Sequence, residues 1–139
     1  MVISAHLRRQ VIQRARSRSE YCGLAQAGQE AAFHIDHVVP VHAGGRTALN
    51  NLALACVSSS LRKGARQTGT DPQTGAEVPL FNPRRDSWRP HFRWSGVRVV
   101  GVSPAGRATL TALKLNRPVA QAIRREEAAR DRHPPPGHL

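Results

Sequence analysis

The spacing of hydrophobic residues predicts a helix near the amino terminus, between residues 6 and 18. Four apolar side chains recur there at helical intervals, and arginines occupy the remaining faces. These four are Leu7, Val11, Ile12 and Ala15. Ser4 precedes the pattern and is a suitable residue to cap the helix, because its hydroxyl can accept a hydrogen bond from a free backbone amide.

The centre of the chain predicts two extended segments followed by a second helix. Residues 32–41 alternate in part between apolar and polar, as a strand does, and a Gly-Gly pair then turns the chain. Residues 49–56 form the second extended segment. The following residues, 57–66, permit a helix, with Ser58 or Ser59 as its cap and basic residues at its end.

The carboxy-terminal half predicts a loop, a strand and two helices. Residues 67–77 carry the Gly, Pro and Asp-Pro punctuation of a loop, and residues 97–102 are typical of a strand. Ser103 and Pro104 favour a helix start, because proline is preferred at the first helical position. A further helix is expected over 118–130, and the Pro-rich tail that follows is expected to be disordered.

The amino-acid composition indicates which class of partner such a domain binds. The 139 residues suffice for one domain with a modest core, and aromatic residues make up only 4%. Lys and Arg total 21 against 9 Asp and Glu, which gives a formal charge of +12. A domain this basic most simply neutralises phosphates, so a nucleic-acid partner is expected. The alternative is a basic protein whose charge serves only solubility.

The start of the chain lacks the apolar stretch of a secretory signal, and no run is long enough to span a membrane. Two cysteines, Cys22 and Cys56, are too few to form the disulfide framework of a secreted scaffold. We therefore expect a cytoplasmic protein with reduced thiols and no membrane partner.

An adjacent acid and imidazole, Asp36 and His37, form the candidate chemical centre. Neighbouring side chains at the end of a strand diverge, so a carboxylate can hold a cation while an imidazole addresses a water on the other side. Phosphodiester hydrolysis needs both, because the cation relieves developing charge and the imidazole activates the water. An isolated Asp-His pair is weak evidence, and a structural pair would be the simpler interpretation.

The longer sequence motif around this pair is more specific evidence than the pair alone. HIDHVVP, HAGG, NNLALAC and a basic R-K-G segment follow in this order, and together they resemble the HNH endonucleases. The segment PLFNPRRDSWRPHFRW with GRATLTALKLN resembles the carboxy-terminal extension of one bacterial subgroup of that family. The resemblance implies an α+β fold, with a ββα-metal core and amino-terminal helix in residues 1–70. A strand and helix extension then covers 71–130, and the disordered tail covers 131–139.

The resemblance also implies roles for individual residues. Asp36 matches the metal ligand and His37 the general base, while Asn51, or its neighbour Asn50, matches the asparagine that braces the loop carrying the base. Ser60 stands where the family usually has an Asn or His that completes the hold on the metal. His34 lies two residues before Asp36 and hence on the same strand face, where it either approaches the metal or packs.

Structural zinc is predicted to be absent. Many relatives place two C-x-x-C pairs around one zinc, but here Ser19 pairs with Cys22 and Ser59 with Cys56. A neutral serine hydroxyl is a poor zinc ligand, and two thiolates do not close a tetrahedral site. Cys22 and Cys56 are expected to remain near each other, as reduced thiols or, under oxidation, as a disulfide.

These observations lead to one leading function and two alternatives. The leading hypothesis is a Mg²⁺- or Mn²⁺-dependent endonuclease of low sequence specificity on double-stranded DNA. Its phosphate contacts would be four basic residues near the site: Arg46, Arg62, Lys63 and Arg66. The alternatives are a weakened or inactive nucleic-acid-binding relative, because Ser60 replaces a ligand, and a basic structural protein that binds RNA.

Overall fold

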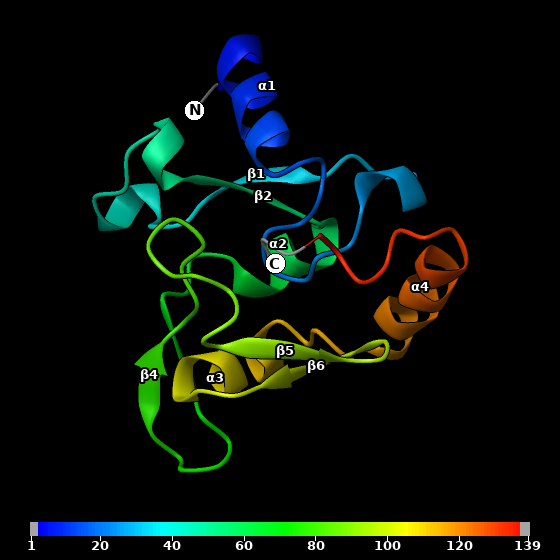
Figure 1. Cartoon of the computed structure of the whole chain (residues 1–139). Coiled ribbons are helices and arrows are strands. Elements are labelled where there is room, and N and C mark those ends of the chain that lie inside the picture. Colours follow the sequence, from blue (N-terminus) through cyan, green and yellow to red (C-terminus); the bar gives the residue numbers. More distant parts are fainter. Residues whose placement is uncertain (1–2, 137–139) are drawn as a thin grey trace.

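The computed structural model describes residues 3–136, and its amino-terminal half places two strands between two helices. The elements are α1 (Ala5–Arg14), β1 (His34–His37), β2 (Leu52–Ala55) and α2 (Val57–Lys63). In Figure 1, α1 lies above the β1–β2 pair and α2 lies below it. Short 3-10 turns at Gln26–Gly28, Val41–Ala43 and Leu49–Asn51 connect these elements.

The cap of each helix follows from local hydrogen bonding. Ser4 Oγ accepts a hydrogen bond from the amide of Leu7 at 3.1 Å, so the predicted cap of α1 is confirmed. The cap of α2 is Cys56, whose sulfur accepts from the amide of Ser59. The prediction of Ser58 or Ser59 was therefore wrong, because the helix begins at Val57, before either serine.

Strands β1 and β2 are antiparallel and set the register of the site. Asp36 lies opposite Ala53, and His37 lies opposite Leu52. All four residues of β2 are buried, whereas all four of β1 are only partly buried. β1 is therefore the strand of this pair whose polar side chains remain partly accessible.

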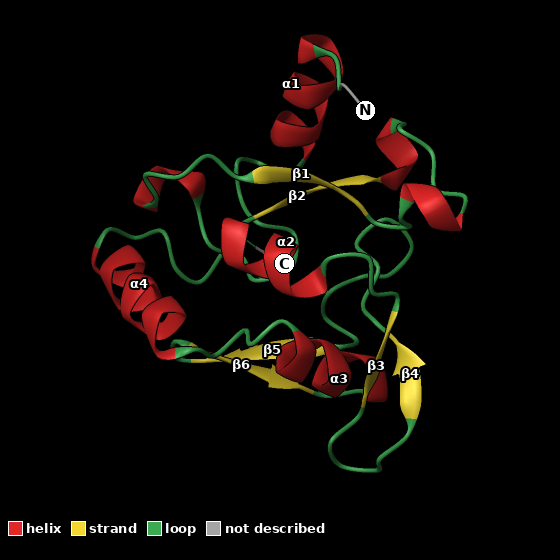
Figure 2. Cartoon of the chain, turned by 180° about the vertical axis from the view of Figure 1, so that it is seen from behind, coloured by secondary structure: helices red, strands yellow, loops and turns green. Residues whose placement is uncertain are grey.

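The remainder of the chain forms a second layer of small antiparallel sheets and helices. Its elements are β3 (Thr68–Thr70), β4 (Glu77–Pro79), β5 (Phe92–Ser95), β6 (Arg98–Gly101), α3 (Pro104–Ala112) and α4 (Pro118–Ala129). β3 pairs with β4 and β5 with β6. Figure 2 shows α3 beside both strand pairs and α4 at the end of the β5–β6 pair away from β3 and β4. The fold is α+β, as predicted, and the β3–β4 pair spans the expected boundary at residue 70.

Three strands in this layer were missed from the sequence. β3 lies inside the segment predicted to be a loop, β4 begins at the last residue of that segment, and β5 lies in a stretch for which no strand was predicted. Each is short and gains its backbone partners from a neighbouring strand rather than from its own alternation pattern. The strand near 97–102 and the helix starting at Pro104 are confirmed, with Ser103 Oγ accepting from the amide of Gly106 at 2.9 Å.

Buried contacts join the second layer to the first. Glu20, which follows α1, forms an ion pair with Arg84 and accepts a hydrogen bond from the amide of Leu54 in β2 at 3.1 Å. Apolar side chains from both layers form a single buried cluster, which includes Val11, Leu52 and Phe92. The second layer therefore packs on the strand pair that carries the candidate site.

Part of the segment expected to be disordered packs on the protein. His133 contacts the Trp94 ring edge-on with centroids 4.7 Å apart, and Arg132 forms an ion pair with Glu127 of α4. The backbone oxygen of Arg132 accepts a hydrogen bond from Arg18. The rest of the expected tail, residues 137–139, lies outside the described residues. No helix within residues 3–136 is long and apolar enough to cross a membrane.

Candidate active site

The face of β1 that meets α2 brings His34 and Ser60 into contact. His34 Nδ1 lies 2.9 Å from Ser60 Oγ, and both side chains are partly buried. They are 26 residues apart in the chain, so the contact depends on α2 packing against β1. Two of the three predicted metal ligands are thus brought together directly.

The third predicted ligand, Asp36, already has a cation beside it. Lys63 Nζ lies 3.1 Å from Asp36 Oδ2, and the Lys63 and Asp36 side chains are 3% and 10% exposed. The Tyr21 hydroxyl donates to the same carboxylate oxygen at 3.2 Å. Burial raises the pKa of Asp36, while the ammonium of Lys63 and the Tyr21 hydrogen bond oppose that shift. Asp36 is therefore a largely buried carboxylate whose surroundings hold positive charge.

His37 is fixed by a contact from the following loop. Its Nε2 lies 2.9 Å from Thr47 Oγ1, and its backbone oxygen accepts a hydrogen bond from Lys63 Nζ at 3.2 Å. Adjacent residues of a strand point to opposite faces, so Asp36 and His37 diverge from β1. The Thr47 contact holds the ring in place.

Asn51 braces the loop that follows β1. Its Oδ1 accepts from the amide of Val39 at 2.9 Å, and its Nδ2 donates to the oxygens of Val39 and Arg46 at 3.0 and 2.9 Å. Gly45 completes the brace, because a Cβ there would lie only 1.8 Å from the Val39 oxygen. This is the role that the resemblance implies for Asn51 rather than for Asn50, which is exposed.

The four predicted phosphate contacts divide into two groups. Arg46, Arg62 and Arg66 are exposed near the strand pair and α2, where they are available to phosphates. Lys63 is instead 2% exposed and held by Asp36, so its assignment to the DNA-contacting surface is corrected. Lys63 follows Ser60 by three residues, and this helical spacing puts both side chains on the face of α2 that meets β1.

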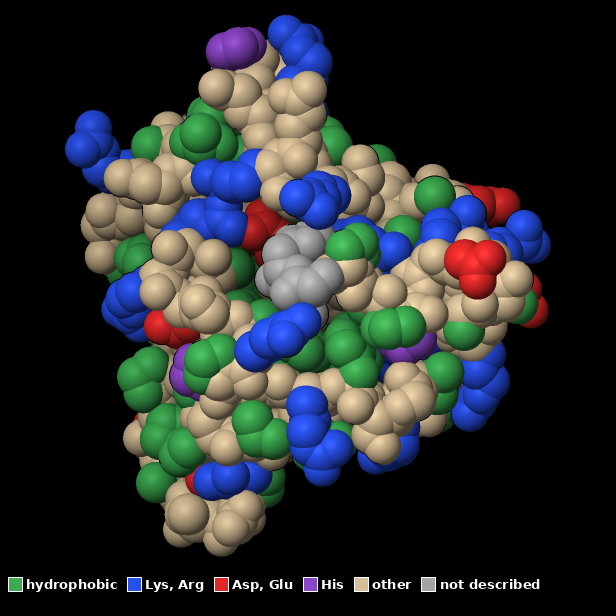
Figure 3. All heavy atoms as spheres, viewed as in Figure 1, with side chains coloured by type: hydrophobic (Ala, Val, Ile, Leu, Met, Phe, Trp, Pro, Cys, Tyr) green, Lys and Arg blue, Asp and Glu red, His purple; other side chains and the backbone are tan. Residues whose placement is uncertain are grey.

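Basic side chains also spread over the wider surface. Figure 3 shows Lys and Arg on the face seen in Figure 1, distributed from α1 to α4 with few acidic side chains among them. Such a surface attracts a polyanion over an extended contact rather than at one point.

Cys22 and Cys56 lie in contact, as expected, with their sulfur atoms 3.3 Å apart and both thiols reduced and buried. Ser19 and Ser59 are buried beside them. Elemental analysis of the purified protein is expected to find no stoichiometric zinc, because the two hydroxyls replace the anionic ligands that a structural zinc needs. One zinc per chain would contradict this prediction.

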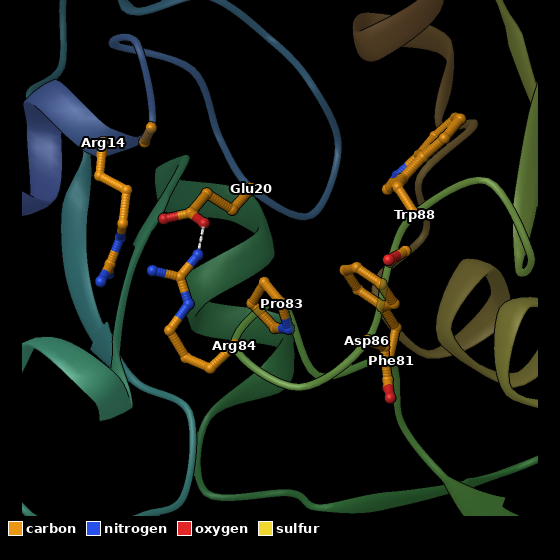
Figure 4. Close-up of a pocket in the computed structure, with 9 residues that line it drawn as sticks. Arg14, Glu20, Phe81, Pro83, Arg84, Asp86 and Trp88 are labelled. Carbon is orange, nitrogen blue, oxygen red and sulfur yellow. Dashed lines mark hydrogen bonds and ion pairs between the residues drawn. The ribbon is translucent and has the colours of Figure 1, made fainter. Parts of the chain in front are cut away.

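A separate pocket lies away from β1 and carries no comparable chemistry. It has a volume of about 260 Å³ and lies between α1 and the segment around residues 81–88. Figure 4 shows the paired Glu20 and Arg84 at its centre, between Arg14 and Trp88. Because Arg84 pairs with the carboxylate of Glu20, the pocket joins the two layers rather than presenting a reactive group.

The site combines an Asp-His pair on one strand of an antiparallel pair, a braced loop and a following helix. Residues 20–66 match the family model for the HNH endonucleases, and this match confirms the resemblance seen in the sequence. No curated protein and no solved structure gave a significant match to the chain.

The matched segment contains every residue that the sequence assigned to the site. It also contains Tyr21 and Thr47, which the sequence did not single out. No local pattern marks Tyr21, since its partner Asp36 is 15 residues away. Thr47 lies in the loop between the strands and is brought to His37 only by the fold.

Proposed function

We propose that the protein is a metal-dependent endonuclease that hydrolyses phosphodiester bonds in double-stranded DNA with low sequence specificity. The observation that carries this proposal is the arrangement of Asp36 and His37, which diverge from one strand beside a loop held by three hydrogen bonds from Asn51. That arrangement lies wholly within the segment that matches the nuclease family. The basic surface supports a nucleic-acid substrate.

The donor set around Asp36 fits a hard divalent ion held partly by substrate. Asp36 provides a carboxylate, His34 an imidazole and Ser60 a hydroxyl. Within residues 3–136, no three His, Cys, Asp or Glu side chains are grouped closely enough to hold an ion by themselves. Mg²⁺ often binds through one or two carboxylates together with phosphate oxygens, so this sparse set suits Mg²⁺ or Mn²⁺ in the presence of DNA.

Different residues of the chain have different roles in the proposed hydrolysis. His37 accepts the proton of the attacking water, and the 2.9 Å contact between its Nε2 and Thr47 Oγ1 fixes the orientation of the ring. Asn51 keeps the loop after β1 in position, and the exposed arginines hold the flanking phosphates. A divalent ion bound at Asp36 would stabilise the negative charge that develops on the phosphate.

A requirement for metal tests the proposal directly. We expect nicking of supercoiled plasmid in Mg²⁺ or Mn²⁺, and no nicking after addition of a chelator. The Asp36→Asn protein should not nick plasmid in Mg²⁺ or in Mn²⁺, because the neutral amide cannot balance the charge of the ion. Cleavage that persists in excess chelator would show that the proposed chemistry is wrong.

Lys63 is expected to oppose the binding of the ion, because both need the Asp36 carboxylate. Two charges about 4 Å apart near a protein surface interact by about 4 kcal/mol. The Lys63→Met protein should therefore bind Mn²⁺ more tightly than the native protein, by about tenfold or more. Electron paramagnetic resonance of free Mn²⁺ measures this, with Arg62→Met as a control on the exposed side of α2.

Equal Mn²⁺ affinity in the native, Lys63→Met and Arg62→Met proteins would contradict this expectation. The Lys63→Met protein is also expected to lose stability without metal, because Asp36 then keeps a buried charge without its partner. Its unfolding temperature should recover as Mn²⁺ is added.

Restoring a longer ligand at residue 60 is expected to raise activity. Serine reaches less far from α2 than the Asn or His that the family usually has, and its hydroxyl is occupied by His34. A Ser60→Asn protein should nick plasmid several-fold faster at a given Mg²⁺ concentration, since an amide oxygen is a suitable ligand for a hard cation. A matched Ser58→Asn protein should not change, and an equal gain in both would contradict the explanation.

A catalytically inactive nucleic-acid-binding protein remains the second candidate. The observation that favours it is the ion pair between Asp36 and Lys63, which neutralises the carboxylate without metal. It predicts DNA binding with salt dependence but no cleavage with any divalent ion.

A further inference from the structure

The two cysteines form a compact pair of thiols at the join between two segments. Cys22 belongs to the turn that follows α1, and Cys56 caps α2. Their sulfur atoms are 3.3 Å apart, with exposed fractions of 0% and 3%. They are the only cysteines in the sequence, so any thiol chemistry of this protein belongs to this pair.

The surroundings make the two thiols unequal. The pKa of Cys56 is lowered, chiefly by the hydrogen bond between its sulfur and that of Cys22, and hydrogen bonds with the Ser59 hydroxyl and amide add to the effect. The same hydrogen bond, together with burial, raises the pKa of Cys22. Arg124 adds a buried positive charge nearby, with its guanidinium 3.3 Å from the Cys22 backbone oxygen. Cys56 is thus the thiol that ionises first.

Cys56 is also the cysteine that lines a groove. The groove has a volume of about 660 Å³ and is bounded by α2, α4 and the segment around Phe33. The groove opens to solvent, because two of the apolar residues that line it, Leu61 and Val119, are 70% and 63% exposed. Arg62 and Arg117 also line it. Cys56 thus lies in the wall of a groove that also carries two cations, whereas Cys22 does not line this groove.

We propose that Cys56 is a thiol–disulfide exchange site for small anionic disulfides that enter through this groove, and that Cys22 resolves the mixed disulfide. The proposal stands on the contact between the two sulfurs, the groove and its arginines. It is independent of the proposed nuclease function.

The exchange balances without any other reactant. The Cys56 thiolate attacks one sulfur of a disulfide RSSR, forming Cys56–S–S–R and releasing one thiolate, which takes up the proton lost by Cys56. Cys22 then attacks the Cys56 sulfur, and the second RS⁻ leaves with the proton of Cys22. The two protein thiols are oxidised to one disulfide, and RSSR is reduced to two RSH.

The final disulfide needs little movement. The sulfur atoms must approach by about 1.2 Å to reach the length of an S–S bond. The bond joins the turn after α1 to the start of α2. A cross-link between these two segments restricts the unfolded chain, so oxidation is expected to raise the unfolding temperature.

Mass spectrometry of the folded protein treated with oxidised glutathione tests the proposal. The native protein should lose both thiols and retain no glutathione, which indicates an internal disulfide. The Cys22→Ser protein should stop at a stable mixed disulfide on Cys56. The Cys56→Ser protein, in which only Cys22 remains, should react at least tenfold more slowly.

The arginines are tested with a neutral reagent as the control. Arg117→Gln should slow the reaction with oxidised glutathione more than the reaction with hydroxyethyl disulfide, because both reactions share the Cys56 thiolate but only the first uses a charged reagent. Equal slowing would overturn the choice of an anionic disulfide. Thiols of the native protein that react only after unfolding in denaturant, or a Cys56→Ser protein as fast as Cys22→Ser, would overturn the site itself.

Discussion

Replacing His37 by alanine is expected to reduce plasmid nicking by at least about a hundredfold, which is the usual contribution of a general base. The imidazole is held by Thr47 at 2.9 Å and diverges from Asp36, so its loss removes the proton acceptor and leaves the carboxylate in place. Nicking rates at saturating Mn²⁺ measure the effect, while the fold should be retained because the side chain is only partly buried.

His42 provides a matched control for this substitution. It lies in the Val41–Ala43 turn five residues further along and is exposed. The His42→Ala protein should cleave at close to the native rate. Equal losses in the two variants would mean that a general effect of imidazole removal, such as weaker DNA binding, explains the change.

Replacing Asn51 by alanine is expected to damage both stability and activity. The substitution removes three hydrogen bonds and leaves the amide of Val39 and the oxygens of Val39 and Arg46 without them. A loss of about 2 to 4 kcal/mol in the free energy of unfolding is expected, since three hydrogen bonds of about 1 kcal/mol each are lost. Urea denaturation measures this loss.

The activity of the folded Asn51→Ala protein should also fall, because the loop after β1 positions His37 and Thr47. Asn50→Ala is the control, since Asn50 is the exposed neighbour that the sequence alone could not separate from Asn51. A stable and active Asn51→Ala protein would contradict the bracing role.

Local patterns were sufficient for much of the first layer. Helical spacing gave α1, the cap at Ser4 and the approximate position of α2, and the motif gave the two strands. The proximity of Cys22 and Cys56 and the brace by Asn51 followed from the resemblance. In each of these cases the relevant interaction is local, or the spacing of the motif encodes it.

Tertiary contacts explain what the sequence did not give. Lys63 was grouped with exposed cations because its charge was visible and its partner was not; Asp36 lies 27 positions earlier. The sequence held one signal for the burial of Lys63, which is its position three residues after Ser60. At that helical spacing both side chains lie on the face of α2 that meets β1. β5 depends on pairing with β6, and His133 on contact with Trp94, so neither followed from local propensity.

The most direct measurement is nicking of supercoiled plasmid with Mn²⁺ by the native protein and the His37→Ala protein side by side. We predict that the native protein nicks the plasmid and that nicking disappears on His37→Ala substitution. Nicking that survives the substitution, or that is absent from the native protein with every divalent ion, would contradict it.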